Sequence, residues 1–157
     1  MNDTELASTL EQYRAGLEAE LAILRQLHGI SGRQREETTT RDFERFAIES
    51  DARDRLTRTL VTIEDGLRAM RDTLTLGRPR LVDHPGYREV LALRHAAEDL
   101  VAQILETDHA SMKALADADL ARRAAMASLE RGETTLAAYR KVITPPVPPA
   151  TLLDRVG

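Results

Sequence analysis

Apolar residues recur at intervals of three and four along most of this 157-residue chain, which is the spacing of an apolar stripe on an α-helix. The longest such stretch runs from about Asp83 to Val142, with Pro85 at a first helical position and no further proline until Pro145. A helix of that length spans roughly 80 Å at 1.5 Å per residue. It therefore needs a partner along most of its apolar face. The stripe comprises Val90, Leu93, Ala97, Leu100, Val101, Ile104, Leu105, Met112, Leu115, Met126, Leu129, Leu136 and Tyr139.

A first helix is predicted from Asn2 or Asp3 to His28. Acidic residues in its first turn suit the positive end of the helix dipole. Gly29 is expected to end it in a left-handed conformation, and residues 33–39 are expected to form a loop. Its apolar stripe comprises Leu6, Leu10, Tyr13, Leu17, Leu21, Leu24 and Leu27.

A second helix is predicted from Thr39 or Thr40 to Leu76, with Thr39 and Asp42 resembling a capping box. Near its start, Glu49 and Arg53 have the spacing of a helical ion pair. A local surface pair is the favoured interpretation, and a polar contact that sets register or meets a partner is the alternative. The apolar seam alternates steps of four and three, which favours shallow left-handed packing. It comprises Leu56, Leu60, Ile63, Leu67, Met70 and Leu74.

The linker from Gly77 to Asp83 contains Pro79 and is short, so the second and third helices are expected to be antiparallel neighbours. The predicted fold is therefore all-α: an up-down-up bundle of three long helices over residues 1–143, the third longest, followed by a Pro-rich C-terminal tail over residues 144–157. The four prolines of that tail favour extended polyproline-type chain. Its apolar Leu152 and Leu153 either dock back on the bundle, stay disordered or meet a partner.

The third helix outreaches the two helices that should cover it, since it is shielded only to about residue 120. An uncovered apolar stripe normally marks an interaction site. Two structural alternatives are a helix break near Gly132, where glycine disfavours a helix interior by about 1 kcal/mol, and pairing of two chains as a homodimer. The predicted partner-binding residues are Met126, Leu129, Leu136, Tyr139, Val142, Leu152 and Leu153.

Composition narrows the function classes. The net charge is −4 with both signs interspersed, which suggests neither a nucleic-acid surface nor an anionic membrane. There is no cysteine, no 18-residue apolar run, and no apolar segment near the N-terminus, so a soluble cytoplasmic protein is expected. Glu106 and His109 form one Glu-x-x-His unit, but a di-iron site requires a second unit and further glutamates. We therefore predict no enzyme activity, no cofactor and no metal site.

In layout the chain resembles the FlgN-type flagellar export chaperones. The resemblance rests on the segment Thr39–Phe46 before the second helix, on Ile104–Asp108 and Leu129–Gly132 in the third, on Ala138-Tyr139-Arg140, and on Leu152–Arg155. The residues Thr40-Arg41 stand before Asp42, where such proteins carry Gly-Asp.

This resemblance implies a cytoplasmic chaperone that binds the terminal segments of hook-associated proteins. Such a chaperone prevents premature assembly and presents its clients to the flagellar type III export apparatus. It also implies that the C-terminal part of the third helix, around Tyr139, faces the client. Two competing hypotheses are a structural coiled-coil adaptor that self-associates through the third helix and a metal-dependent helical-bundle enzyme.

Overall fold

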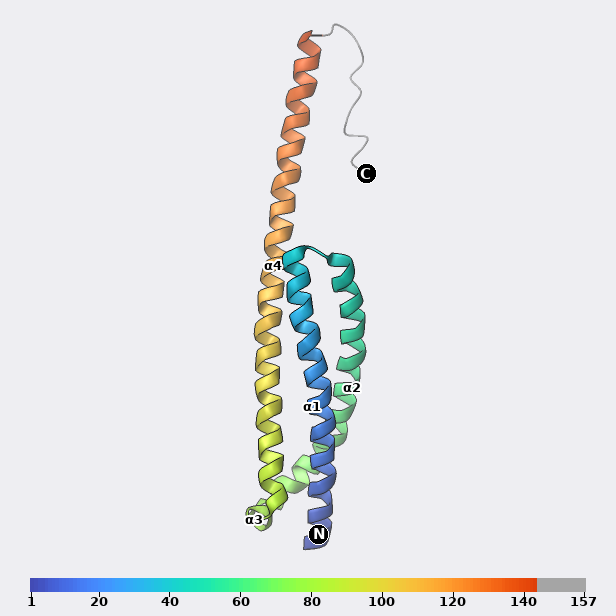
Figure 1. Cartoon of the computed structure of the whole chain (residues 1–157), viewed down its shortest axis with the longest axis vertical. Coiled ribbons are helices and arrows are strands. Elements are labelled where there is room, and N and C mark those ends of the chain that lie inside the picture. Colours follow the sequence, from blue (N-terminus) through green and yellow to red (C-terminus); the bar gives the residue numbers. More distant parts are fainter. Residues whose placement is uncertain (144–157) are drawn as a thin grey trace. The chain divides into compact units, whose positions relative to one another are not determined.

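The computed structural model describes residues 1–143 and, within them, the side chains of residues 1–132 and 134. The described residues form α-helices and no β-strand, so the all-α prediction is confirmed. In chain order the helices are α1 (Asp3–Thr40), α2 (Phe43–Leu76), the short α3 (Arg78–Leu81) and α4 (Pro85–Ile143) (Figure 1). The chain divides into two compact units, Met1–Met112 and Lys113–Gly157, and α4 contributes to both.

The first helix begins where the sequence predicted but ends much later. Its start is a capping box in which the Asn2 side chain accepts a hydrogen bond from the Glu5 backbone N–H at 2.8 Å and the Glu5 carboxylate accepts one from the Asn2 N–H at 2.9 Å. The predicted stop at Gly29 and the predicted loop over 33–39 are wrong, because α1 continues to Thr40. Packing explains the continuation. The buried face of α1 continues past Gly29 through the apolar Ile30 and then through the buried polar residues Ser31, Gln34, Glu37 and Thr38.

Arg41 follows the last residue of α1 as its C-cap and adopts the left-handed conformation with φ 59°. The predicted capping box of Thr39 with Asp42 is also wrong. Thr39 is still helical, and Asp42 itself caps α2 by accepting a hydrogen bond from the Arg45 N–H at 3.1 Å. The predicted Glu49–Arg53 pair does not form. Instead, Glu49 pairs with Arg33 of α1 at 2.7 Å, and Arg53 pairs with Asp108 of α4.

In the unit Met1–Met112, α1 packs against both other long helices along one apolar face (Figure 1). Contacts of α1 with α2 run in opposite chain directions, since Gly16 lies against Leu67 and Arg33 pairs with Glu49. Contacts with α4 run in the same direction, since Arg14 bonds Glu89 and Ser31 bonds Asp108. Two buried clusters result. The first comprises Leu6, Leu10, Tyr13, Leu17, Leu67, Leu74, Leu81 and Val90. The second comprises Leu21, Leu24, Leu27, Ala97 and Ile104.

The predicted linker between α2 and α4 contains the short helix α3, whose first turn holds Pro79 and whose last residue, Leu81, is buried in the first cluster. Further along, α4 runs through Gly132 without a break, so the alternative of a break at that glycine is wrong. Its last residue, Ile143, is one position from the predicted end. The predicted tail, residues 144–157, lies outside the described residues, so the domain boundary at 143/144 stays a prediction.

The contact between α1 and α2 at Gly16 gives a first testable prediction. A Cβ added at Gly16 would lie 2.3 Å from Leu67 Cδ2, whereas one added at Gly66 meets nothing within 4 Å. Overpacking costs about 1–3 kcal/mol, and alanine gains only ~1 kcal/mol in helix propensity over glycine. We therefore expect Gly16→Ala to lower the free energy of unfolding by about 1 kcal/mol and Gly66→Ala to raise it by up to ~1 kcal/mol.

Urea denaturation followed by circular dichroism measures both glycine variants under one condition. Equal stabilisation by the two substitutions would contradict the close approach of α1 and α2 at Gly16.

Candidate partner-binding surface

The structure describes two of the seven predicted partner-binding side chains, and both are accessible to solvent. Met126 is 37% exposed and Leu129 is 69% exposed. Leu136, Tyr139 and Val142 lie in the helical backbone of α4, but their side chains are outside the described residues. Leu152 and Leu153 lie outside the described residues altogether. The structure therefore bears on the first part of the predicted surface.

In the unit Lys113–Gly157, all the side chains that the structure describes, apolar ones included, are at least partly accessible to solvent. None of the side chains of residues 113–132 and 134 is buried. Leu120 is 68% exposed, as accessible as Leu129. At 3.6 residues per turn, these two leucines are about half a turn apart around the helix. Leu129 shares its side of the helix with Met126, and Leu120 does not.

Charged pairs flank this apolar face. Asp119 bonds Arg122 at 3.2 Å and Arg123 at 3.0 Å, both at helical spacing. The Arg122 guanidinium also donates to the sulfur of Met126 at 3.5 Å. Such pairs stabilise an isolated helix by about 0.2–0.5 kcal/mol each. They support helical structure in this part of α4 without covering Leu129.

In the unit Met1–Met112, α4 carries two neighbouring apolar stripes rather than one. Ile104 is 7% exposed and belongs to the core, whereas the adjacent Leu105 is 54% exposed. Leu91, Val101 and Met112 are exposed in the same way. In the stripe predicted from the sequence, Val101 and Leu105 are grouped with the core residues. Val101 and Leu105 directly follow the core residues Leu100 and Ile104 in the sequence. Each residue turns the helix by about 100°, so these two side chains must point to a different side from the core, and this spacing indicates a second stripe.

This second stripe borders a cavity of about 460 Å³ between α1, α2 and α4. Val101 and Leu105 line it from α4, and Leu17 lines it from α1. Polar groups line it as well, among them Glu20 and Glu64. Burial raises the pKa of Glu20, with the neighbouring Glu64 adding to the effect. The cavity is therefore amphipathic and open rather than a sealed apolar pocket.

A polar cluster joins α1, α2 and α4 near the end of the second core cluster. The Arg53 guanidinium forms two hydrogen bonds to the Asp108 carboxylate, one of them Nη1 to Oδ1 at 2.8 Å. Ser31 also donates to Asp108, at 2.9 Å, and Arg53 donates to Gln34 at 3.1 Å. These hydrogen bonds, led by those from Arg53, hold the pKa of Asp108 below its usual range. Arg53 is thus neither part of a local surface pair nor paired with Glu49, because it pairs across the unit with Asp108.

The Glu-x-x-His unit of Glu106 and His109 lies next to this polar cluster in the sequence. Asp108, between Glu106 and His109, is committed to Arg53. Within the described part of the chain, no group of three or more His, Asp or Glu side chains is arranged to hold a metal ion.

No helix among the described residues is both long and apolar enough to cross a membrane.

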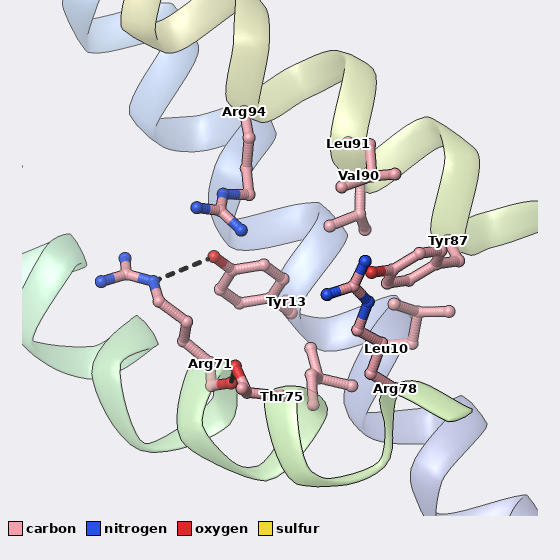
Figure 2. A pocket seen from close by; sticks show the side chains of 10 residues that line it. Leu10, Tyr13, Arg71, Thr75, Arg78, Tyr87, Val90, Leu91 and Arg94 are labelled. Atoms are coloured by element: carbon pink, nitrogen blue, oxygen red, sulfur yellow. Dashed lines mark hydrogen bonds between the residues drawn. The ribbon is translucent and has the colours of Figure 1, made fainter. Parts of the chain in front are cut away.

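A second cavity, of about 210 Å³, lies at the other end of the same unit. Tyr13 of α1, Arg71 of α2, Arg78 of α3, and Tyr87 and Arg94 of α4 line it together with five other residues (Figure 2). The sequence does not reveal this cavity, because its polar residues come from four helices and share no motif. The full lining is Leu10, Tyr13, Arg71, Leu74, Thr75, Arg78, Tyr87, Val90, Leu91 and Arg94.

Comparison with known proteins leaves the family open. No protein-family model, curated protein or solved structure matches this chain.

Proposed function

We propose that the chain is a cytoplasmic export chaperone that binds terminal helical segments of flagellar hook-associated proteins. Its three long helices form an up-down-up bundle, and the C-terminal part of α4 carries the client. The client is kept from assembling early and is presented to the type III export apparatus. The assignment of client and pathway rests on the resemblance of the sequence pattern to the FlgN-type chaperones. The proposal assigns no catalytic step and no cofactor.

The observation that carries this proposal is the exposure of apolar side chains along α4 in the unit Lys113–Gly157. Leu129 is 69% exposed and Met126, on the same side of the helix, is 37% exposed, and no described side chain of the unit is buried. Exposed apolar surface on a regular helix is the feature by which amphipathic partner helices are bound. Met126 adds a flexible thioether of the kind that adapts to clients of differing shape.

Binding follows from the same geometry. An amphipathic client helix lays its apolar face on Met126 and Leu129, while its polar face stays in water. The charged residues Asp119 and Arg123 flank the contact and restrict its register. A client that is disordered when free must become ordered on binding, and this lowers the net affinity. Moderate affinity suits a chaperone, because the client has to be released at export.

A structural coiled-coil adaptor is the second candidate function. The exposed Leu91, Leu105 and Met112 support it, because their separations of 14 and seven residues in the sequence match a heptad seam. In that case two copies of the chain pair through α4 and no client exists. Light scattering over a concentration series separates the two candidates, since a tight dimer that ignores client segments favours the adaptor.

Co-purification tests the chaperone proposal itself. The full chain is expressed with the terminal segment of a hook-associated protein and passed over a gel-filtration column. The proposal expects a complex of the chain and the segment in defined stoichiometry. Separate elution of the two at micromolar concentration would contradict it.

A further inference from the structure

The cavity of about 210 Å³ lined by Arg71, Arg78 and Arg94 has an unusual charge balance. No aspartate or glutamate is among its ten lining residues. Arg71 is partly neutralised, since it pairs with Glu64 at 2.5 Å outside the lining. Arg78 and Arg94 form no ion pair with any residue in the described part of the chain. The lining of this cavity therefore carries positive charge and no carboxylate, although Arg71 and Arg94 also border the neighbouring cavity, which contains Glu20, Glu64 and Glu98.

The polar groups around the cavity are arranged as hydrogen-bond donors. Arginine has only donors. The Tyr13 hydroxyl accepts a hydrogen bond from Arg71 Nε at 3.2 Å, which leaves its own proton free to donate. Figure 2 shows Nε of Arg71 facing the Tyr13 hydroxyl while its terminal nitrogens point away, the Arg94 guanidinium on another side of the same hydroxyl, and the Arg78 guanidinium next to Tyr87. A group rich in acceptors and negatively charged is the complement of this arrangement.

The floor and walls of the cavity are apolar. Leu10, Tyr13, Leu74 and Val90 belong to the first buried cluster and line the cavity from α1, α2 and α4. A ligand seated there therefore places an apolar or aromatic body against these side chains. The volume is equivalent to about seven water molecules at ~30 Å³ each, which suits a single-ring molecule rather than a nucleotide or a drug-sized ligand.

We propose that this cavity is a binding site for a small organic oxyanion, a carboxylate or phosphate group on an apolar or aromatic body, with Arg94 and the Tyr13 hydroxyl on one side of the Tyr13 ring and Arg78 on the other supplying the positive charge and the donors. Arginine binds both headgroups through paired N–H donors. The buried cluster beneath fixes Tyr13, so one wall of the site is pre-organised. The site is independent of the proposed client-binding surface of α4.

Titration of the full chain with phenyl phosphate tests the proposal. Inorganic phosphate and phenol serve as probes of the headgroup and of the ring alone. Binding is measured by calorimetry and by NMR of the arginine Nε–Hε groups. We expect saturable binding of phenyl phosphate at least ~10-fold tighter than either half-probe, with shifts of the Arg78 and Arg94 signals. Benzoate in parallel identifies the headgroup, and tighter binding of either aromatic anion supports the proposal.

The matched variants are the double substitution Arg78→Gln with Arg94→Gln and the control Arg88→Gln. Arg88 is an exposed arginine of α4 that does not line the cavity. The double variant is expected to weaken binding at least ~10-fold, and the control to leave it within about twofold. Because Arg78 and Arg94 are exposed, the fold persists, and circular dichroism verifies it.

Three results would overturn the site: no saturable binding at millimolar probe, equal binding of inorganic phosphate and phenyl phosphate, or equal weakening by Arg88→Gln.

Discussion

Replacing Leu129 by glutamate is expected to weaken binding of a hook-associated terminal segment at least ~30-fold, the effect of losing one central apolar anchor of about 2 kcal/mol. Leu129 is 69% exposed in the free chain, so the substitution removes little packing within the described residues. In the complex, the glutamate would place a charge in an apolar contact without a partner. Calorimetric titration of the segment into the full chain measures the change.

Leu120→Glu is the matched control, because Leu120 has nearly the same exposure, lies in the same helix and points about half a turn away. We expect it to change affinity by no more than about twofold, in line with other surface changes outside an interface. Adding Leu136→Glu to Leu129→Glu is expected to abolish capture in gel filtration. Equal effects of the substitutions at 120 and 129 would show that binding does not use the Met126–Leu129 side of α4.

Asp108→Ala is expected to lower the free energy of unfolding by about 2 kcal/mol at pH 7, between the values for exposed and buried ion pairs. The side chains of Arg53 and Asp108 are 27% and 19% exposed, so solvent screens the pair only in part. The substitution leaves the Arg53 guanidinium without its carboxylate and removes the acceptor of the Ser31 hydroxyl. Urea denaturation followed by circular dichroism provides the measurement.

The same variant has a predictable pH dependence. Hydrogen bonds from Arg53 place the folded-state pKa of Asp108 below that of the unfolded chain. The stability that this carboxylate contributes is therefore fully present above the unfolded pKa and is lost as the pH falls through the folded one. The difference between the original chain and Asp108→Ala should shrink below about pH 4.

Asp99→Ala is the control for Asp108→Ala, because Asp99 is an exposed carboxylate of the same helix. It is expected to change stability by no more than about 0.5 kcal/mol. A difference between Asp108→Ala and the original chain that stays constant from neutral pH to pH 3 would contradict the assigned role of the pair.

The spacing of apolar residues alone was sufficient to predict the long helices, because buried side chains recur every three or four residues along them. It failed at the end of α1 for a definite reason. Gly29 and Gly32 are poor helix formers, but Ile30, Ser31 and Gln34 are buried against the rest of the unit, and this packing outweighs about 1 kcal/mol per glycine. The left-handed residue is Arg41, an amino acid that sequence rules do not favour there.

The polar sites could not be predicted because their members are distant in sequence. Ser31 and Asp108 are 77 residues apart, and Tyr13 and Arg71 are 58 apart. Only the packed unit brings them together. For the predicted partner-binding residues, sequence and structure agree on the accessibility of Met126 and Leu129. Leu136, Tyr139 and Val142 stay predictions.

Site-specific photocrosslinking tests the central claim most directly, because it reports what contacts Leu129 in solution. p-Benzoylphenylalanine is placed at position 129 and, as the control, at position 120, and the full chain is irradiated with and without a hook-associated terminal segment. The proposal predicts a crosslink to the segment from position 129 and little from position 120. A crosslink from position 129 to residues 1–112 of the same chain, or to a second copy whether or not the segment is present, would contradict it.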